Sequence, residues 1–258
     1  MLMTGCNADK SVLKVYNWGD YIDEAVLDMF TEETGIRVDY STFASNEEMY
    51  AKLKSGAGDY DVIFPSDYMI ERMSKEGLLA PIDTAGLENY PYIGDDFKNM
   101  EFDPKNQYSV PYMWGTVGIL YNTSMVDDPV NSWNILWDEK YSGQIMMYNS
   151  SRDSMMVALS RLGYDINTRN EAQIEEAIQS LIEQKPHVLA YVEDEVGDKM
   201  IAGEGAFAVV YSGEAVLAMG GNEDLDYVIP QEGSNIWVDS MAIPESSSMK
   251  DEAVRFIN

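Results

Sequence analysis

Short apolar segments that fit β-strands alternate with amphipathic segments that fit helices along the chain, and this alternation constrains the fold most strongly. In the first part of the chain the expected strands cover residues 13–18, 36–40 and 60–65, and the expected helices cover residues 23–34, 46–55 and 68–76. Gly35 and Gly77 follow two of these helices at the usual C-terminal cap position. Strands that alternate with helices of this length indicate an α/β fold with a mostly parallel sheet.

A second α/β block follows an extended apolar segment at residues 112–121. Its expected elements are strands near 144–148 and at 206–211, helices at 154–162 and 171–184, and a last strand at 236–243. With 258 residues the chain exceeds the usual size of one domain. We expect two lobes, formed by residues 11–115 with 238–258 and by residues 116–237, which two crossing segments join. The chain ends inside an expected helix, so we expect an α/β fold truncated at its C-terminus.

The charge balance narrows the possible partners. Lys and Arg number 17 and Asp and Glu number 45, which gives a formal net charge of -28. This charge repels phosphate backbones and anionic lipid headgroups, so we expect no nucleic-acid partner. The acidity fits either a well-solvated surface or the attraction of cations. One Cys and one His exclude a disulfide within the chain and disfavour zinc sites and Cys/His nucleophilic catalysis, so we expect no metal and no cofactor.

The N-terminal sequence MLMTGCN places small residues before a cysteine, as in the cleavage site of a bacterial lipoprotein. Cys6 is then the expected lipid attachment site and the first residue of the mature protein. We interpret residues 1–10 as the remnant of a signal peptide, its cleavage site and a tether. Together with the absence of an apolar run of about 18 residues in the sequence, this predicts a membrane contact through a lipid anchor alone.

Aromatic residues recur beside carboxylates at the C-terminal ends of the expected strands, where open α/β sheets bind ligands. The instances are Trp18 with Asp20 and Tyr21, Ser66 with Asp67 and Tyr68, Tyr211 with Glu214, and Trp237 with Asp239. A protonated polyamine requires this combination, because each ammonium group needs a carboxylate and the methylenes between them need flat apolar walls. The pattern therefore favours binding of a small organic cation.

Several motifs in the same order resemble those of the spermidine/putrescine-binding proteins of bacterial ABC importers. They are YNWGDYI at 16–22, FTEETGIRV at 30–38, YSTFASNEEMYAKLK at 40–54, PSDY at 65–68 and WVDSMAIP at 237–244. The resemblance covers the chain from about residue 13 to its end. It implies a periplasmic-binding-protein type II fold, with two α/β lobes, crossing hinge segments and a ligand cleft that closes by hinge motion.

The resemblance also implies which residues bind the ligand, namely Trp18, Asp20, Tyr21, Ser66, Tyr68, Asp153, Tyr211, Glu214, Trp237 and Asp239. Asp153 stands at the family's acidic position just before a helix, and Tyr211 stands where a Trp is usual. Ser150 replaces a second acid that spermidine binders tend to carry, and Glu214 is an acid where putrescine binders have one. Asp20 and Glu214 together favour putrescine, or a mixed preference for diamines and triamines.

The expected function is therefore that of a monomeric extracytoplasmic protein that captures a polyamine and delivers it to an ABC transporter permease, without catalysis. One alternative keeps the fold and binds iron, a sugar or another organic cation. A more remote alternative is a glycosidase that uses paired carboxylates such as Asp153 and Glu214. A surface scaffold that leaves the cleft unused is a third possibility.

Overall fold

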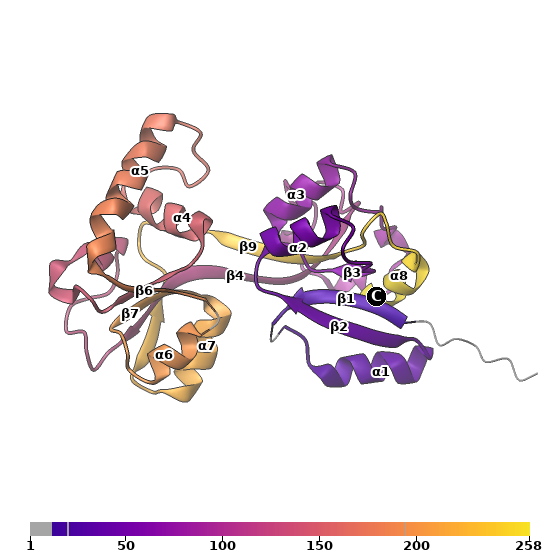
Figure 1. The fold of residues 1–258 in the computed structure, drawn as a ribbon, viewed down its shortest axis with the longest axis horizontal. Helices are drawn as coiled ribbons and strands as arrows, with labels where there is room; N and C mark the ends of the chain where they lie inside the picture. The colour runs from indigo at the N-terminus through magenta and orange to yellow at the C-terminus, as the bar shows by residue number, and fades with distance from the viewer. Residues whose placement is uncertain (1–11, 20, 194) are drawn as a thin grey trace, which may run out of the picture. The chain divides into compact units, whose positions relative to one another are not determined.

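A computed structural model describes residues 12–19, 21–193 and 195–258, which divide into two compact units. Unit 1 comprises the described residues up to Trp114 together with Val238–Asn258, and unit 2 comprises Gly115–Trp237. Strands β4 (Ser109–Asn122) and β9 (Ile236–Ala242) each run across a boundary between the units (Figure 1). The chain therefore passes between the units twice, both times within a strand.

Unit 1 contains a sheet with the strand order β2-β1-β3-β9. Its other strands are β1 (Val12–Trp18), β2 (Arg37–Phe43) and β3 (Val62–Ile63). Strand β1 pairs in parallel with β2 and β3, whereas β9 pairs antiparallel with β3. The helices of this unit are α1 (Glu24–Thr34), α2 (Asn46–Lys54), α3 (Asp67–Lys75) and α8 (Lys250–Ile257).

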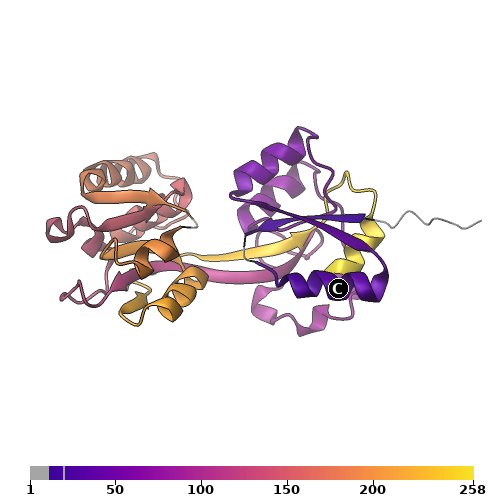
Figure 2. The same ribbon diagram turned by 60° about the horizontal axis from the view of Figure 1, so that its bottom comes forward.

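Alternate side chains of the unit 1 strands point to opposite faces of the sheet, and each face is covered by helices (Figures 1 and 2). Leu13 and Val15 belong to one buried cluster, which Phe30 of α1 and Ile257 of α8 join. The other cluster combines strand residues with side chains of α2 and α3, among them Tyr16, Ile63, Met49 and Met69. The alternation of side chains along β1 thus gives the sheet two buried faces, each packed against helices.

Helices α1 and α2 each begin at a residue whose side chain caps the helix. The side chain of Asp23 accepts a hydrogen bond from the Ala25 backbone N–H (2.9 Å) at the start of α1. Ser45 caps α2 in the same manner through the N–H of Glu48 (3.2 Å). Gly35 ends α1 with a φ of 75°, a left-handed conformation that glycine adopts without steric cost.

Unit 2 contains a mixed sheet in which β4 lies between β8 and β7, followed by β5 and β6. Its further strands are β5 (Ile145–Tyr148), β6 (Val188–Val192), β7 (Phe207–Tyr211) and β8 (Leu225–Val228). Strand β5 is parallel to β6 and β7, and β4 is antiparallel to β7 and β8. The helices are α4 (Ser151–Arg161), α5 (Glu171–Gln184), α6 (Val196–Ile201) and α7 (Ser212–Gly221).

The unit 2 sheet also buries both faces. Ile119 and Phe207 pack with Trp133 and with Met156 of α4 on one face. On the other face Leu120 joins a cluster that includes residues of α6 and α7, such as Val196, Met200, Ala215 and Ala218. Short 3-10 helices complete the two units at Thr84–Gly86, Tyr90–Tyr92, Asp95–Phe97, Trp133–Trp137, Glu139–Tyr141 and Lys185–His187.

The expected α/β fold is confirmed, with differences in detail. Strand β9 pairs antiparallel with β3, and β4 pairs antiparallel with β7, because both strands run directly from one unit into the other instead of returning through a helix. The strand expected at residues 60–65 is paired as a strand over Val62–Ile63 alone. Strands β6 and β8 and helices α6 and α7 were not expected from the sequence. None of the helices in the described ranges is long and apolar enough to cross a membrane.

Candidate functional site

In unit 1, the end of β1, the start of α3 and the middle of β9 meet. Ser66 is the residue before α3 and forms an isolated antiparallel bridge with Asp239 of β9. The amide of Asn46 fixes Ser66 through two hydrogen bonds, donating to its Oγ (2.8 Å) and accepting from its backbone N–H (3.1 Å). The Trp18 indole, at the end of β1, donates to the carbonyl oxygen of Phe64 (2.8 Å). Backbone pairing and amide contacts therefore hold these predicted site residues in place.

Tyr21 joins this group through its hydroxyl and its ring. Its Oη donates a hydrogen bond to Oδ2 of Asp239 at 2.7 Å, although the two residues are 218 positions apart. The ring centroid of Tyr21 lies 6.5 Å from that of Trp18 and 5.9 Å from that of Tyr112. The hydroxyl of Tyr112 donates to the backbone carbonyl of Tyr21 and so holds its main chain. Aromatic rings thus lie next to a carboxylate, as the sequence pattern predicts.

Asp239 is an unusual carboxylate because it is 4% exposed. Burial raises the pKa of Asp239 to about 6, and the negative charge of Asp67 adds to the rise, while polar contacts with Ser66 and Tyr21 oppose it. Its Oδ1 has no hydrogen-bond partner among the described residues. A buried carboxylate with an open oxygen is a poor structural element, but it is well suited to receive a charged donor from a ligand.

A second group of predicted residues lies in unit 2 and repeats the pairing of a tyrosine with an aspartate. The Tyr211 hydroxyl, at the end of β7, donates to Oδ2 of Asp153 at 2.7 Å. Asp153 is 6% exposed and lies in the first turn of α4. Burial raises the pKa of Tyr211 strongly, and the charges of Asp153, Tyr148 and Glu214 raise it further. Tyr211 therefore stays neutral and remains a hydrogen-bond donor.

Aromatic rings surround the Tyr211 phenol. The Tyr148 ring lies 4.8 Å from it at an interplanar angle of 62°, and the Trp237 ring lies 5.8 Å from it at 79°. Both arrangements are the edge-to-face contacts that aromatic pairs prefer. Glu214 lies in the first turn of α7, and Tyr211 is the N-cap residue of the same helix. Unit 2 therefore also combines carboxylates with aromatic walls.

Cys6 and Asp20 lie outside the described residues. Tyr68 lies in the first turn of α3, and its hydroxyl donates to Oε1 of Glu47 on α2 at 3.1 Å. The placement of Asp153 before its helix was wrong: Ser150 caps α4 by accepting from the Asp153 N–H (3.3 Å), so the helix starts at Ser151 and includes Asp153.

Sequence reasoning left three neighbouring residues out of the predicted set. Asp67 lies next to Ser66, and its negative charge raises the pKa of Asp239. Tyr112 donates a hydrogen bond to the backbone carbonyl of Tyr21. The ring of Tyr148 packs against the ring of Tyr211. Tyr148 is the last residue of β5, so the rule that found the other aromatics, position at the end of a strand, applies to it too. Tyr112 lies inside β4, where no local signal distinguishes it.

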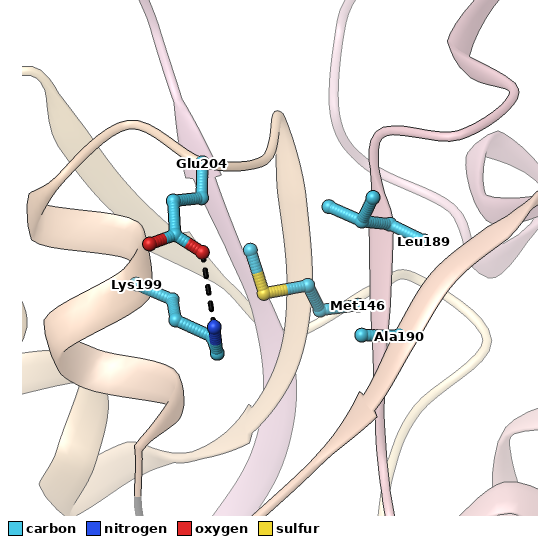
Figure 3. Close-up of a pocket in the computed structure, with 5 residues that line it drawn as sticks. All are labelled: Met146, Leu189, Ala190, Lys199 and Glu204. Atoms are coloured by element: carbon cyan, nitrogen blue, oxygen red, sulfur yellow. Dashed lines mark hydrogen bonds and ion pairs between the residues drawn. The ribbon is translucent and has the colours of Figure 1, made fainter.

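A separate pocket of about 400 Å³ lies in unit 2, and Figure 3 shows five residues that line it. Lys199 and Glu204 form an ion pair there (3.0 Å), beside Met146, Leu189 and Ala190. None of these residues belongs to the predicted set. The carboxylate of this pocket is already paired with Lys199, so the pocket lacks the combination that a ligand cation requires.

Comparisons with known proteins show the family of the chain. Residues 25–258 match the family described as bacterial extracellular solute-binding protein. The chain is 39% identical over 252 residues to the spermidine/putrescine-binding periplasmic protein of Escherichia coli K12. The aligned region covers 97% of this chain and 72% of that protein.

Two solved structures are similar along almost the whole chain. One is the spermidine/putrescine ABC transporter substrate-binding protein PotD from Streptococcus pneumoniae (TM-score 0.83, 45% identity, 96% of this chain and 77% of that one). The other is the TpPotD lipoprotein of Treponema pallidum (TM-score 0.89, 31% identity, 96% and 79%). The fold is thus the periplasmic-binding-protein type II fold, as expected, and the class of protein is that of the substrate-binding proteins. The chain belongs to the bacterial extracellular solute-binding protein family.

Proposed function

We propose that this protein captures a polyamine, putrescine or spermidine, outside the cytoplasm and delivers it to the permease of an ABC importer. One observation carries the proposal: each unit presents a buried aspartate that accepts a tyrosine hydroxyl and lies beside aromatic rings. These are Asp239 with Tyr21 in unit 1 and Asp153 with Tyr211 in unit 2. The E. coli and S. pneumoniae proteins described above carry spermidine and putrescine in their names.

The chemistry of a polyamine fits these residues closely. Its ammonium groups are strong donors and match the carboxylates of Asp239, Asp153 and Glu214. Its methylene segments need apolar contact, which the rings of Trp18 and Trp237 supply, and cation–π attraction adds about 0.5–2 kcal/mol per contact. We propose that the residues predicted from the sequence in both units, including Asp20, take part in binding.

Ferric iron, the metal alternative, is less well supported. An iron ligand set would use tyrosine phenolates, but the hydroxyls of Tyr21, Tyr68 and Tyr211 each donate to a carboxylate. Because the pKa of Tyr211 is strongly raised, its phenolate form is disfavoured. We also propose that the protein performs no catalysis, since the proteins of its family bind and transfer their solutes unchanged.

A thermal-shift panel tests the proposal. Putrescine and spermidine are expected to raise the melting temperature, because a ligand at 100 times its Kd stabilises the native state by about 2.7 kcal/mol. Butane-1,4-diol, which has the length of putrescine without its charges, is the matched control and is expected to have no effect. Stabilisation by maltose or ferric citrate without a response to either amine would contradict the proposal.

The affinity is expected to fall with acidification because of Asp239. The amine pairs with the ionised carboxylate, so below its pKa of about 6 the ligand must displace a proton. Each further pH unit then weakens binding by about tenfold, and binding near the pKa releases protons. Calorimetric titrations in buffers with different ionisation enthalpies measure this release. A constant affinity from pH 7 down to about one unit below the pKa would contradict the assignment.

The location also follows from the family, whose members act outside the cytoplasm. We propose in addition that Cys6 carries a lipid anchor and that the protein works as a monomer. The anchor rests on the sequence MLMTGC and on the likeness to a T. pallidum lipoprotein. The intact mass of the protein extracted from membranes tests the anchor; an unmodified Cys6 in a fully processed protein would refute it.

A further inference from the structure

Trp237 differs from three other tryptophans of the chain in how its indole is held. The indole N–H groups of Trp18, Trp133 and Trp137 donate to backbone carbonyl oxygens at 2.8 Å, 2.9 Å and 2.8 Å. The buried Nε1 of Trp237 has no acceptor within the described part of the chain. Hydrogen bonding therefore does not fix this ring, and steric contact with its neighbours must decide where it lies.

One of these neighbours is Gly115 in β4. A Cβ atom at residue 115 would lie 2.4 Å from Cζ2 and 2.9 Å from Cε2 of the Trp237 indole, far inside van der Waals contact. It would also lie 2.7 Å from the Oγ of Ser212, the first residue of α7. The indole thus occupies the space that any side chain at residue 115 would fill.

Neither obstacle moves easily. Ser212 Oγ accepts a hydrogen bond from the backbone N–H of Thr116 at 3.2 Å, which ties it to the strand. The indole also meets the ring of Tyr211, 5.8 Å away between centroids. Since Tyr211 in turn donates to Asp153, the indole lies against a chain of fixed groups. A shift of the ring away from residue 115 therefore disturbs the aromatic wall of unit 2.

We infer that Gly115 is a positioning residue for ligand binding: its missing side chain lets the Trp237 indole lie against the backbone of β4, beside Tyr211. The inference rests on the proposed function and deepens it, because it assigns a role to a residue outside the predicted ligand-binding set. The smallest side chain, that of alanine, is sufficient to displace the ring.

The same strand provides a matched control. Gly118 also lies under an aromatic ring, and a Cβ atom there would be 2.4 Å from Cζ of Tyr227. Gly118→Ala therefore introduces the same substitution, in the same strand, with a clash of equal size. Tyr227 is not among the predicted ligand residues. The two variants separate general damage to unit 2 from damage to the position of Trp237.

The experiment measures spermidine and putrescine affinity by calorimetry for the wild type, Gly115→Ala, Gly118→Ala, Trp237→Phe and the Gly115→Ala/Trp237→Phe double variant. Gly115→Ala is expected to weaken binding by at least about tenfold, because the displaced indole loses its aromatic contact with the ligand cation. Gly118→Ala is expected to leave affinity within about threefold of the wild type, since the ring that it displaces, that of Tyr227, is not among the predicted ligand residues. In the Trp237→Phe background, Gly115→Ala is expected to change affinity by less than about threefold, because the smaller ring removes the contact with the indole and the contact with Ser212 Oγ alone remains.

Two results would overturn the inference: a folded Gly115→Ala protein with wild-type affinity, or the same loss of affinity in the Trp237→Phe background as in the wild type. Fluorescence of the ligand-free proteins gives a second test that needs no polyamine. The emission of Trp237, isolated as the difference from Trp237→Phe, is expected to change in Gly115→Ala and to stay unchanged in Gly118→Ala. If the wild type binds no polyamine, the proposed function fails, and this spectrum still decides the role of Gly115.

Discussion

Replacing Asp239 by Asn is expected to weaken polyamine binding by about 2–5 kcal/mol, the cost of removing one partner of a buried, charge-assisted hydrogen bond. The expectation follows from the position of this carboxylate, which is 4% exposed and has an oxygen without a partner among the described residues. The amide of Asn can still accept the hydroxyl of Tyr21, so the local geometry is retained. Calorimetric titration of the folded variant measures the loss.

The same substitution is expected to stabilise the ligand-free protein at neutral pH. A carboxyl group whose pKa rises from 3.8 to about 6 on folding costs the native state up to about 3 kcal/mol once it is ionised. The stabilising contribution of the protonated group is complete below 3.8 and is lost as the pH rises through about 6. The stability gain of Asp239→Asn, measured by denaturant unfolding, is thus expected to grow over this range.

Asp226→Asn is the matched control for both measurements. Asp226 also accepts a tyrosine hydroxyl, that of Tyr121 at 3.0 Å, but it is exposed. Neither affinity nor stability is expected to change by more than about 0.5 kcal/mol, as for most surface substitutions. If Asp239→Asn behaved like Asp226→Asn, the carboxylate of Asp239 would not be the group that receives the amine.

Replacing Tyr211 by Phe is expected to destabilise the ligand-free protein by about 1.5–3 kcal/mol, the contribution of a hydrogen bond to a charged group in a buried site. The substitution removes the hydroxyl that donates to the buried Asp153 and leaves that carboxylate without this donor. The ring remains in place against Tyr148 and Trp237, so the packing is retained. Urea unfolding at neutral pH measures the effect.

Tyr121→Phe removes a hydroxyl of the same kind from the same unit, but its acceptor Asp226 is exposed. Water replaces the lost donor there, so the expected cost is below about 0.5 kcal/mol. Equal losses in Tyr211→Phe and Tyr121→Phe would mean that Asp153 is solvated in the folded protein, and the account of unit 2 as a buried, preorganised group would be wrong.

Much of the fold could be predicted because its periodicity is strong. Residues 13–18 alternate in sequence as a strand does, and β1 forms there with alternating buried and partly exposed residues. Helix α1 begins after Asp23 and ends at Gly35, as these residue types predict. The missed elements are those whose local signal is weak. Helix α6 has six residues, β8 has four, and α7 contains the helix-disfavouring Gly213, Gly220 and Gly221. Tertiary packing stabilises these elements.

The composition of the candidate site could be predicted, but its internal contacts could not. Aromatic and acidic residues at strand ends indicated residues that the structure brings together within each unit, since that rule depends on neighbouring residues in the sequence. The bond between Tyr21 and Asp239 joins residues 218 positions apart, and no local pattern encodes it. The space that Gly115 leaves for Trp237 is likewise a property of the assembled strands and appears in the sequence merely as one glycine among 19.

Calorimetric titration of the wild-type protein with putrescine and spermidine, beside maltose and ferric citrate, is the decisive test of polyamine binding. We expect saturable binding of an amine, weakened by acid and by Asp239→Asn, and no binding of the sugar or the iron complex. Binding of maltose or ferric citrate with no heat from either amine would contradict it.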